Sequence, residues 1–307
     1  MKKVGLVYND VYLKHKAPPG HPEREARLVS IMNVLRDSEL WDKLIKVEPR
    51  KAEYSELETV HTKEYVERMK NTRSGYADPD TYISEGSLEA ALYAAGGVIE
   101  AVDRCRSGEI ERAFCAVRPP GHHAEAGRAM GFCLFNNVAV GARHAQKVGY
   151  EKVFIVDFDV HHGNGTQHIF EDDDTVFYFS THQYPHYPGT GSAGERGRGK
   201  GEGFTANFPM PPGSGDGEYA EVYGKVLPEI MRHFAPDIVM VSAGYDLRSS
   251  DPLAQIRVSA RGIEDIVRGI LSGANVPSVF CLEGGYNLEA LAESAYLTIK
   301  ILVENQG

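Results

Sequence analysis

The sequence predicts a single α/β domain over residues 1–307, in which a largely parallel sheet carries helices on both faces. Three observations support this prediction. Short apolar runs rich in β-branched residues alternate with longer segments of helical periodicity, an order that is typical of parallel sheets. No linker, repeat or low-complexity block divides the chain, and its 307 residues are enough to bury a large core.

Eight short apolar runs are the candidate strands. They are residues 4–8, 44–48, 113–117, 152–160, 175–180, 205–210, 237–244 and 277–285. Segments with a helical spacing of apolar residues lie between them. The clearest of these are residues 84–105, 136–149, 216–234 and 259–274. Strand and helix therefore alternate along most of the chain.

Composition and charge exclude some classes of function. The formal net charge of −10 argues against a nucleic acid or an anionic membrane as the main partner, because both bind a basic surface. The four cysteines have no paired spacing, which is typical of a reducing compartment. The apolar run near the N-terminus is too short for a signal peptide, and no later run is long enough to cross a membrane. We therefore expect a cytoplasmic protein.

Polar residues gather where four of the predicted strands end. "AFCAV" leads into "RPPGHHAE", "FIVDFDV" into "HHGNG", "VMVSAGYD" into "LRSSDP", and "VFCLEGGY" into a helix. Ligands of open parallel sheets bind beyond the carboxyl ends of the strands. We therefore expect these four loops to form one site.

The segment "DFDVHHG" predicts a metal site. If it stays extended, its period of two places Asp157, Asp159 and His161 on one face. A lone aspartate at a strand end is more often a hydrogen-bonded acid than a ligand. Two aspartates and two histidines within six residues favour a metal, because carboxylate oxygen and imidazole nitrogen are both zinc ligands.

A third ligand is expected in "VSAGYDLRSSDPL". Asp246 directly follows the strand, whereas Asp251 precedes a proline, where an acid is more often a cap or turn former. With Asp159 and His161, Asp246 makes three protein ligands. That number leaves a position open for water and substrate, as a catalytic metal requires.

Two further clusters carry candidates for proton transfer and charge stabilisation. His122 and His123 follow a rigid proline pair and would transfer protons beside a metal, although such a pair can also be a surface feature. Tyr286 follows two glycines and could donate a hydrogen bond to a developing oxyanion, although a core tyrosine is common. Asp157 and Asn164 remain available to orient the two imidazoles.

These clusters, with "GHPEREARL" (20–28) and "GFCLFNN" (131–137), resemble the zinc-dependent histone deacetylase and acetylpolyamine amidohydrolase family. The resemblance extends from about residue 5 to residue 295, and the motifs are highly specific as a set. It implies the arginase/deacetylase fold, a single α/β domain with a largely parallel eight-stranded sheet. It also implies hydrolysis of N-acetyl amides, with an acylated lysine or another acylated amine as substrate.

The resemblance also assigns roles to individual residues. One catalytic Zn²⁺ would be held by Asp159, His161 and Asp246. His122, His123 and Tyr286 match the catalytic histidines and tyrosine, with Asp157 partnering His122. Asn164 stands where some branches carry a second aspartate beside His123, so His123 is less clearly polarised by an acid. A structural K⁺ would be bound by Asp157, Asp159, His161, Ser180 and Thr181. The acyl tunnel would be lined by Gly131, Phe132 and Tyr187, with Leu253 at its rim.

Three alternatives remain open. A two-metal ureohydrolase of the same fold needs an acid where this chain has Gly163. A catalytically silent acyl-lysine binder would be expected to lack a zinc ligand, a histidine or the tyrosine, and none is missing. An acetylpolyamine deacetylase needs a carboxylate at the tunnel mouth. Because Leu253 is uncharged, we expect acetyl-lysine to be preferred, unless Asp80 or Glu23 faces the tunnel. Iron instead of zinc, the acyl-chain preference and the oligomeric state stay open.

Overall fold

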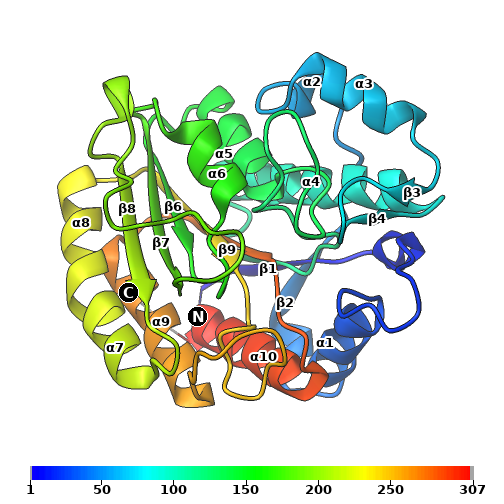
Figure 1. The fold of residues 1–307 in the computed structure, drawn as a ribbon. Coiled ribbons are helices and arrows are strands. Elements are labelled where there is room, and N and C mark those ends of the chain that lie inside the picture. Colours follow the sequence, from blue (N-terminus) through cyan, green and yellow to red (C-terminus); the bar gives the residue numbers. More distant parts are fainter. Residues whose placement is uncertain (1, 305–307) are drawn as a thin grey trace.

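A computed structural model describes residues 2–304 of the chain as a three-layered α/β domain (Figure 1). Its central sheet has eight strands, all parallel, in the order β2-β1-β5-β10-β9-β6-β7-β8. They are β1 (Val4–Val7), β2 (Leu44–Val47), β5 (Arg112–Cys115), β6 (Val153–Asp157), β7 (Val176–Gln183), β8 (Thr205–Met210), β9 (Ile238–Ala243) and β10 (Ser278–Leu282). The predicted fold class and all eight predicted strands are confirmed.

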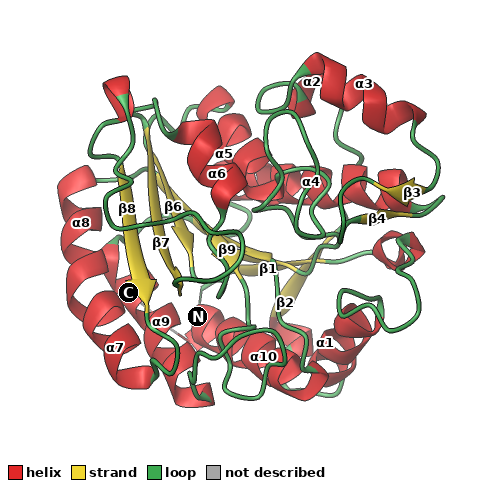
Figure 2. Cartoon of the chain, viewed as in Figure 1, coloured by secondary structure: helices red, strands yellow, loops and turns green. Residues whose placement is uncertain are grey.

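Helices cover both faces of the sheet (Figure 2). One layer contains α4 (Ser87–Arg106), α5 (Asn137–Lys147) and α6 (Asn164–Phe170). The opposite layer contains α1 (Ala26–Arg36), α7 (Asp216–Glu221), α8 (Leu227–Phe234), α9 (Ala260–Gly273) and α10 (Leu288–Glu304). Burial on both faces explains why the central strands read as continuous apolar runs.

Smaller elements complete the chain. They are α2 (Tyr54–Leu57), α3 (Lys63–Asn71), the hairpin of β3 (Gly75–Tyr76) and β4 (Tyr82–Ile83), the short 3₁₀ helices η1 (Asp10–Lys14), η2 (Trp41–Lys43) and η3 (Gly199–Gly201), and a π-helical turn, η4 (Val222–Val226). The hairpin was not predicted. Its two residues per strand are too few for the alternation that marks a strand in a sequence.

Two predicted elements differ from the structure. The run 152–160 stops being a strand at Asp157. Phe158 N–H still donates to Ser242 O of β9, but Asp159 N–H donates to the carboxylate of Asp157 and Val160 N–H donates to that of Asp246, so the ladder ends there. The helix expected over 216–234 is interrupted by η4. Pro228 lacks the N–H that would bond one turn back, and a wider π turn accommodates its ring.

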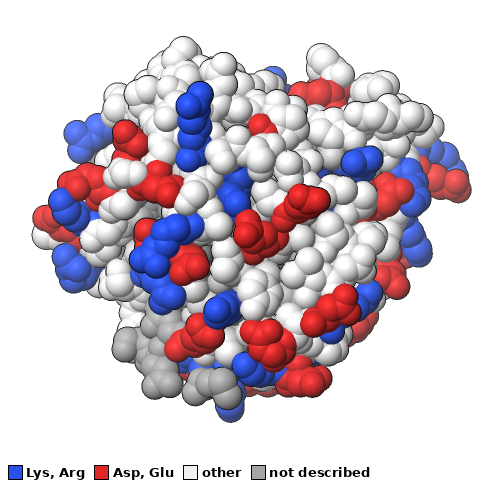
Figure 3. Space-filling model, turned by 90° about the horizontal axis from the view of Figure 1, so that it is seen from below, with Lys and Arg blue, Asp and Glu red and all other residues white. Residues whose placement is uncertain are grey.

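The buried apolar residues form one hydrophobic core, and charged side chains lie on the surface. No helix within residues 2–304 is both long enough and apolar enough to span a bilayer. On the face seen in Figure 3, acidic and basic side chains are interspersed rather than gathered into one charged area. All four cysteines are buried and unpaired. These findings do not assign a compartment, so cytoplasmic location stays a prediction.

Candidate active site

The loops after β5, β6, β9 and β10 meet at one cavity of about 190 Å³ beyond the carboxyl ends of the strands. Eight residues predicted for the site line it: His122, His123, Gly131, Phe132, His161, Tyr187, Leu253 and Tyr286. A larger cavity of about 630 Å³ lies between β8 and α8, but it contains none of the predicted residues. The smaller cavity is therefore the candidate active site, because the ionisable groups converge there.

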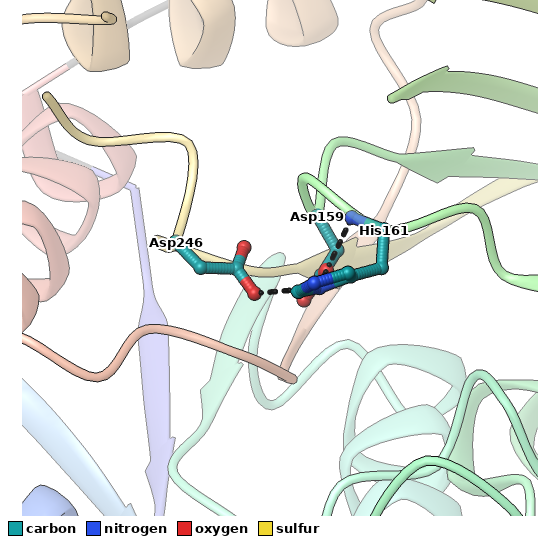
Figure 4. Close-up of side chains that lie close together, drawn as sticks. All are labelled: Asp159, His161 and Asp246. Atoms are coloured by element: carbon teal, nitrogen blue, oxygen red, sulfur yellow. Dashed lines mark hydrogen bonds and ion pairs between the residues drawn. The ribbon is translucent and has the colours of Figure 1, made fainter. Parts of the chain in front are cut away.

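Asp159, His161 and Asp246 come together at the base of this cavity (Figure 4). One ligand atom from each lies within 4.8 Å of the other two, and all three residues are buried. His161 Nδ1 lies 3.2 Å from Asp159 Oδ1 and 3.1 Å from Asp246 Oδ2. Two oxygens and one imidazole nitrogen around one point are a donor set that fits zinc.

Main-chain amides hold the two carboxylates in place. Asp159 Oδ1 accepts from His161 N–H at 2.9 Å, and its Oδ2 accepts from Gly284 N–H at 2.8 Å. Asp246 Oδ1 accepts from Val160 N–H at 3.0 Å. These bonds use the backbone of two loops, those after β6 and β10, so main-chain groups of the fold orient the ligand atoms. The carboxylate oxygens are therefore held in position before a metal ion binds, as a metal centre requires.

The charge balance of this group also fits a cation. Burial opposes protonation of His161, but hydrogen bonds to Asp159 and Asp246 outweigh it and raise the pKa of His161 to about 10. A positive charge between two buried carboxylates is therefore strongly favoured. A metal ion bound by the same three atoms would satisfy that demand.

The histidine pair lies beside this group, with the two rings 4.0 Å apart between centroids. His122 Nδ1 lies 3.0 Å from Asp157 Oδ2, and His123 Nδ1 lies 2.7 Å from Asn164 Oδ1. Each imidazole thus contacts one of the two residues, Asp157 and Asn164, that were expected to orient the histidines. Asn164 begins α6 and Asp157 ends β6, so one strand-loop-helix unit orients both rings.

The two histidines have opposite electrostatic surroundings. Burial opposes protonation of His122, but the carboxylates of Asp157 and Asp159 outweigh it and raise the pKa of His122 to about 10. Burial, with repulsion from His122, lowers the pKa of His123 well below its usual range. His122 is therefore the cationic member of the pair, and His123 is the neutral member.

Tyr286 lies on the cavity wall at the N-terminal end of α10. Its main-chain N–H donates to Asp251 Oδ2 at 2.7 Å, which confirms that Asp251 has the capping role expected from its position. The Arg27 guanidinium carbon lies 5.0 Å from the centroid of the phenol ring, and Phe132 packs against that ring edge-on. Among residues 2–304, no hydrogen-bond partner occupies the phenol hydroxyl. Desolvation raises the pKa of Tyr286 well above its usual value, so the group stays a neutral donor.

Gly163 occupies the position where a two-metal ureohydrolase would need an acid. A Cβ atom at this residue would lie 2.2 Å from Asp157 Oδ2 and 2.7 Å from the Tyr178 hydroxyl. Both atoms belong to buried side chains that bond to each other at 3.1 Å. The space for a second acidic ligand is therefore already filled, which argues against a two-metal site.

The walls and mouth of the cavity contain the predicted tunnel residues. Gly131 has a positive φ of 56°, and a Cβ there would lie 2.4 Å from the His123 ring, so only glycine lets the wall approach the imidazole. Phe132 and Tyr187 also line the cavity, and the Tyr187 ring packs edge-on against His123 at 5.3 Å. Leu253 lies at the same cavity, as expected for a rim residue.

The mouth also contains an acid, which corrects the expectation of an uncharged rim. Asp80, from the loop between β3 and β4, lines the cavity. Burial and the neighbouring Asp78 raise its pKa to about 6, so it is mostly ionised at neutral pH. Glu23, the other acid considered from the sequence, instead lies in a buried ion pair with Arg118 at 2.6 Å.

Three further lining residues were not predicted: Pro120, His186 and Gly284. The His186 ring stacks on that of His161 with centroids 5.2 Å apart, and its Nε2 bonds to the main-chain oxygen of Leu253 at 3.1 Å. A histidine in "QYPHYPG" has no signal of its own in the sequence. The only indication that His186 could reach the site was that it follows the "DFDVHHG" segment along the chain.

The residues proposed for potassium are Asp157, Asp159, His161, Ser180 and Thr181, which lie at or just after the end of β6 and in the neighbouring part of β7. Asp157 is paired with Ser180 across the two parallel strands. Ser180 Oγ lies 2.8 Å from His182 Nδ1, and Thr181 Oγ1 lies 2.8 Å from the Tyr223 hydroxyl. The grouping agrees with the expectation, but potassium binding stays a prediction.

The amino-acid sequence of the chain is similar to those of several known proteins. Residues 21–302 match the sequence profile of the histone deacetylase domain. A probable deacetylase of Archaeoglobus fulgidus is 42% identical over 293 residues, covering 93% of this chain and 82% of that protein. Human polyamine deacetylase HDAC10 is 37% identical over 300 residues, covering 92% of this chain and 44% of that protein.

Two plant proteins extend the comparison. Histone deacetylase 5 of Arabidopsis thaliana is 38% identical over 328 residues, which cover 99% of this chain and only 50% of that protein. The chain thus spans about half the length of this relative. The crystal structure of the HDA15 HD domain superposes with a TM-score of 0.94 at 38% identity, covering 99% of this chain and 89% of that domain.

Proposed function

Because this chain belongs to the histone deacetylase family, we propose that it is a zinc-dependent amidohydrolase that removes acetyl or other short acyl groups from acylated amines. The observation that carries the proposal is the convergence of Asp159, His161 and Asp246 with two oriented histidines and a free phenol in one cavity. A silent acyl-lysine binder would not need all of these groups. We propose that residues 1–307 act as a single catalytic domain.

Asp159, His161 and Asp246 would hold one zinc ion. A zinc ion bound there would polarise the acyl carbonyl and make a bound water molecule more acidic. Main-chain amides orient the two carboxylates before any ligand arrives. We also propose one structural potassium ion at Asp157, Asp159, His161, Ser180 and Thr181. Support for it comes from the fully buried carboxylate of Asp157 and the hydroxyls beside it.

His123 would move the proton. Its Nδ1 carries a hydrogen that it donates to Asn164 Oδ1, so the lone pair is on Nε2. Nε2 would accept a proton from the attacking water and later return it to the leaving amine. The cationic His122, held by Asp157, would stabilise negative charge near the reacting carbonyl.

Tyr286 would stabilise the charge that develops on the carbonyl oxygen. Its hydroxyl is uncommitted, and its main chain is anchored to Asp251. Phe132 and Arg27 restrict the ring, so the donor is already oriented before the substrate binds. Phe132 and Tyr187 line the same cavity and would contact the stem of the acyl-amine.

The substrate would be an acylated lysine or an acylated polyamine, and Asp80 bears on that choice. An uncharged rim at Leu253 alone would favour acetyl-lysine. A carboxylate at the mouth can offset the desolvation of a second ammonium group on an acetylpolyamine. With Asp80 at the cavity, we expect the preference for acetyl-lysine to be smaller than an uncharged mouth predicts.

We expect Asp80→Asn to lower kcat/KM for acetylspermidine by roughly threefold to tenfold, and to change kcat/KM for a neutral acetyl-lysine peptide by less than about twofold. The measurement is acetate release from both substrates at low and high salt. Leu253→Glu is the matched variant, since it adds a carboxylate at the mouth and should favour acetylspermidine. Equal effects of Asp80→Asn on both substrates would show that Asp80 does not contact the distal amine. No acetate from any acylated amine would refute the proposed function itself.

A further inference from the structure

A row of polar groups leads from His123 away from the cavity. His123 Nδ1 lies 2.7 Å from Asn164 Oδ1, and Asn164 Nδ2 lies 2.5 Å from Glu125 Oε1. The Glu125 carboxylate also contacts His168, whose Nδ1 lies 2.9 Å from Oε1 and 3.1 Å from Oε2. The row therefore runs from a buried imidazole to a partly exposed one.

Glu125 determines which way the Asn164 amide points. An ionised carboxylate only accepts hydrogen bonds, so it must face the amide nitrogen. The other atoms near Asn164 Nδ2, the main-chain oxygen of His123 and the sulfur of Met130, are also acceptors, each at 3.5 Å. The amide oxygen must then face His123. A hydrogen bond from His168 to Glu125 raises the pKa of His168, as expected if Glu125 is ionised.

We propose that Glu125 is a positioning residue for proton transfer: it orients the Asn164 amide, and the amide in turn keeps His123 in the tautomer whose Nε2 can accept a proton. This inference rests on the proposed role of His123 as the proton acceptor. In this chain the pair Asn164 and Glu125 replaces a single acid beside the imidazole. The Asn164 amide orients the His123 imidazole. The Glu125 carboxylate provides the negative charge, and it contacts Asn164 rather than His123.

Glu125 is itself well anchored, so its substitution should leave the loop intact. Its side chain is 14% exposed. Its main-chain N–H donates to Arg128 O at 3.0 Å, and its main-chain oxygen accepts from His61 Nδ1 at 3.0 Å. Neither bond involves the carboxylate. A change at the carboxylate therefore tests the row of polar groups rather than the fold.

The first test is Glu125→Gln, which keeps the shape but can present either oxygen or nitrogen to Asn164. Only the two distant acceptors at 3.5 Å then still favour the original orientation of the Asn164 amide, so the flipped orientation becomes populated and part of the His123 population loses its Nδ1–H partner. We expect kcat for an acetyl-lysine peptide to fall roughly tenfold while KM and zinc content stay unchanged. His168→Gln is the matched control, because it removes the outer partner of Glu125 only, and should change kcat by less than about twofold.

The decisive test combines two substitutions. Asn164→Asp alone places a second carboxylate against Glu125, so we expect a loss of kcat from the repulsion between them. In the combination of Glu125→Gln with Asn164→Asp, the glutamine amide donates to the new carboxylate, which accepts from His123 without a choice of orientation. We expect this double variant to regain kcat to within about threefold of the wild-type value, so each substitution rescues the other.

Two results would overturn the inference: a wild-type kcat in Glu125→Gln, or a double variant no more active than either single one. His123→Ala, measured in parallel, keeps this question separate from the proposed function. A wild-type kcat in His123→Ala would refute the role of His123, whatever the Glu125 variants show. A strong loss in His123→Ala together with a wild-type kcat in Glu125→Gln would refute only the positioning role.

Discussion

Tyr286→Phe should lower kcat for an acetyl-lysine peptide by roughly 100-fold to 1,000-fold, the cost of removing one preorganised donor to a developing oxyanion. The substitution removes only the hydroxyl. The ring contacts with Phe132 and Arg27 are available to phenylalanine as well, and the main-chain bond to Asp251 is unchanged. KM and zinc content should therefore stay near the wild-type values.

The matched control is Tyr12→Phe. Tyr12 is a fully buried tyrosine whose hydroxyl donates to the main-chain oxygen of Tyr93 at 3.2 Å, so the variant loses a phenol hydroxyl outside the cavity. We expect it to lower the melting temperature but to leave kcat within about twofold. Turnover near the wild-type value in Tyr286→Phe would mean that another donor stabilises the oxyanion. Loss of zinc in that variant would mean that the ligands are misassigned.

His123→Ala should lower kcat by at least roughly 100-fold, because it removes the group that accepts and returns the proton. His123 bonds to Asn164 and is not among the three metal-binding residues, so zinc should remain bound. The measurement is kcat together with the zinc content of the purified variant. His144→Gln removes a histidine of α5 that bonds to Asp103 of α4 and does not line the cavity; it is the control and should behave like the wild type. A smaller loss in His123→Ala than in His122→Ala would reverse the roles of the two histidines.

The parts of the site that could be predicted are those whose pattern lies within a single segment of the sequence. Eight apolar runs indicated the strands, and four of them lead into polar residues at the carboxyl end, so those four loops could be expected to meet. Asp157 and Asn164 were expected to orient the two imidazoles because the metal would not use them, and the family resemblance implied which histidine each would contact; the structure brings both pairs together.

Other features depend on contacts between segments that are far apart in the sequence. The periodicity of residues 152–160 predicts an extended segment that reaches His161. In the structure, side-chain carboxylates accept hydrogen bonds from the amides of Asp159 and Val160. Periodicity carries no information about such bonds. Asp80 and His186 reach the cavity from loops whose paths are set by the fold. The orienting contact between Glu125 and Asn164 joins residues 39 positions apart. None of these can be read from the spacing of residue types.

We propose that one zinc ion at Asp159, His161 and Asp246 makes this chain an amidohydrolase. The most direct test strips the metal with a chelator, confirms its absence by mass spectrometry, and measures hydrolysis of an acetyl-lysine peptide as zinc is added in fractions of an equivalent. We predict no detectable activity without metal, a linear rise up to one equivalent, and a plateau beyond it. Full activity in the metal-free protein, or a rise that continues to two equivalents, would contradict the account.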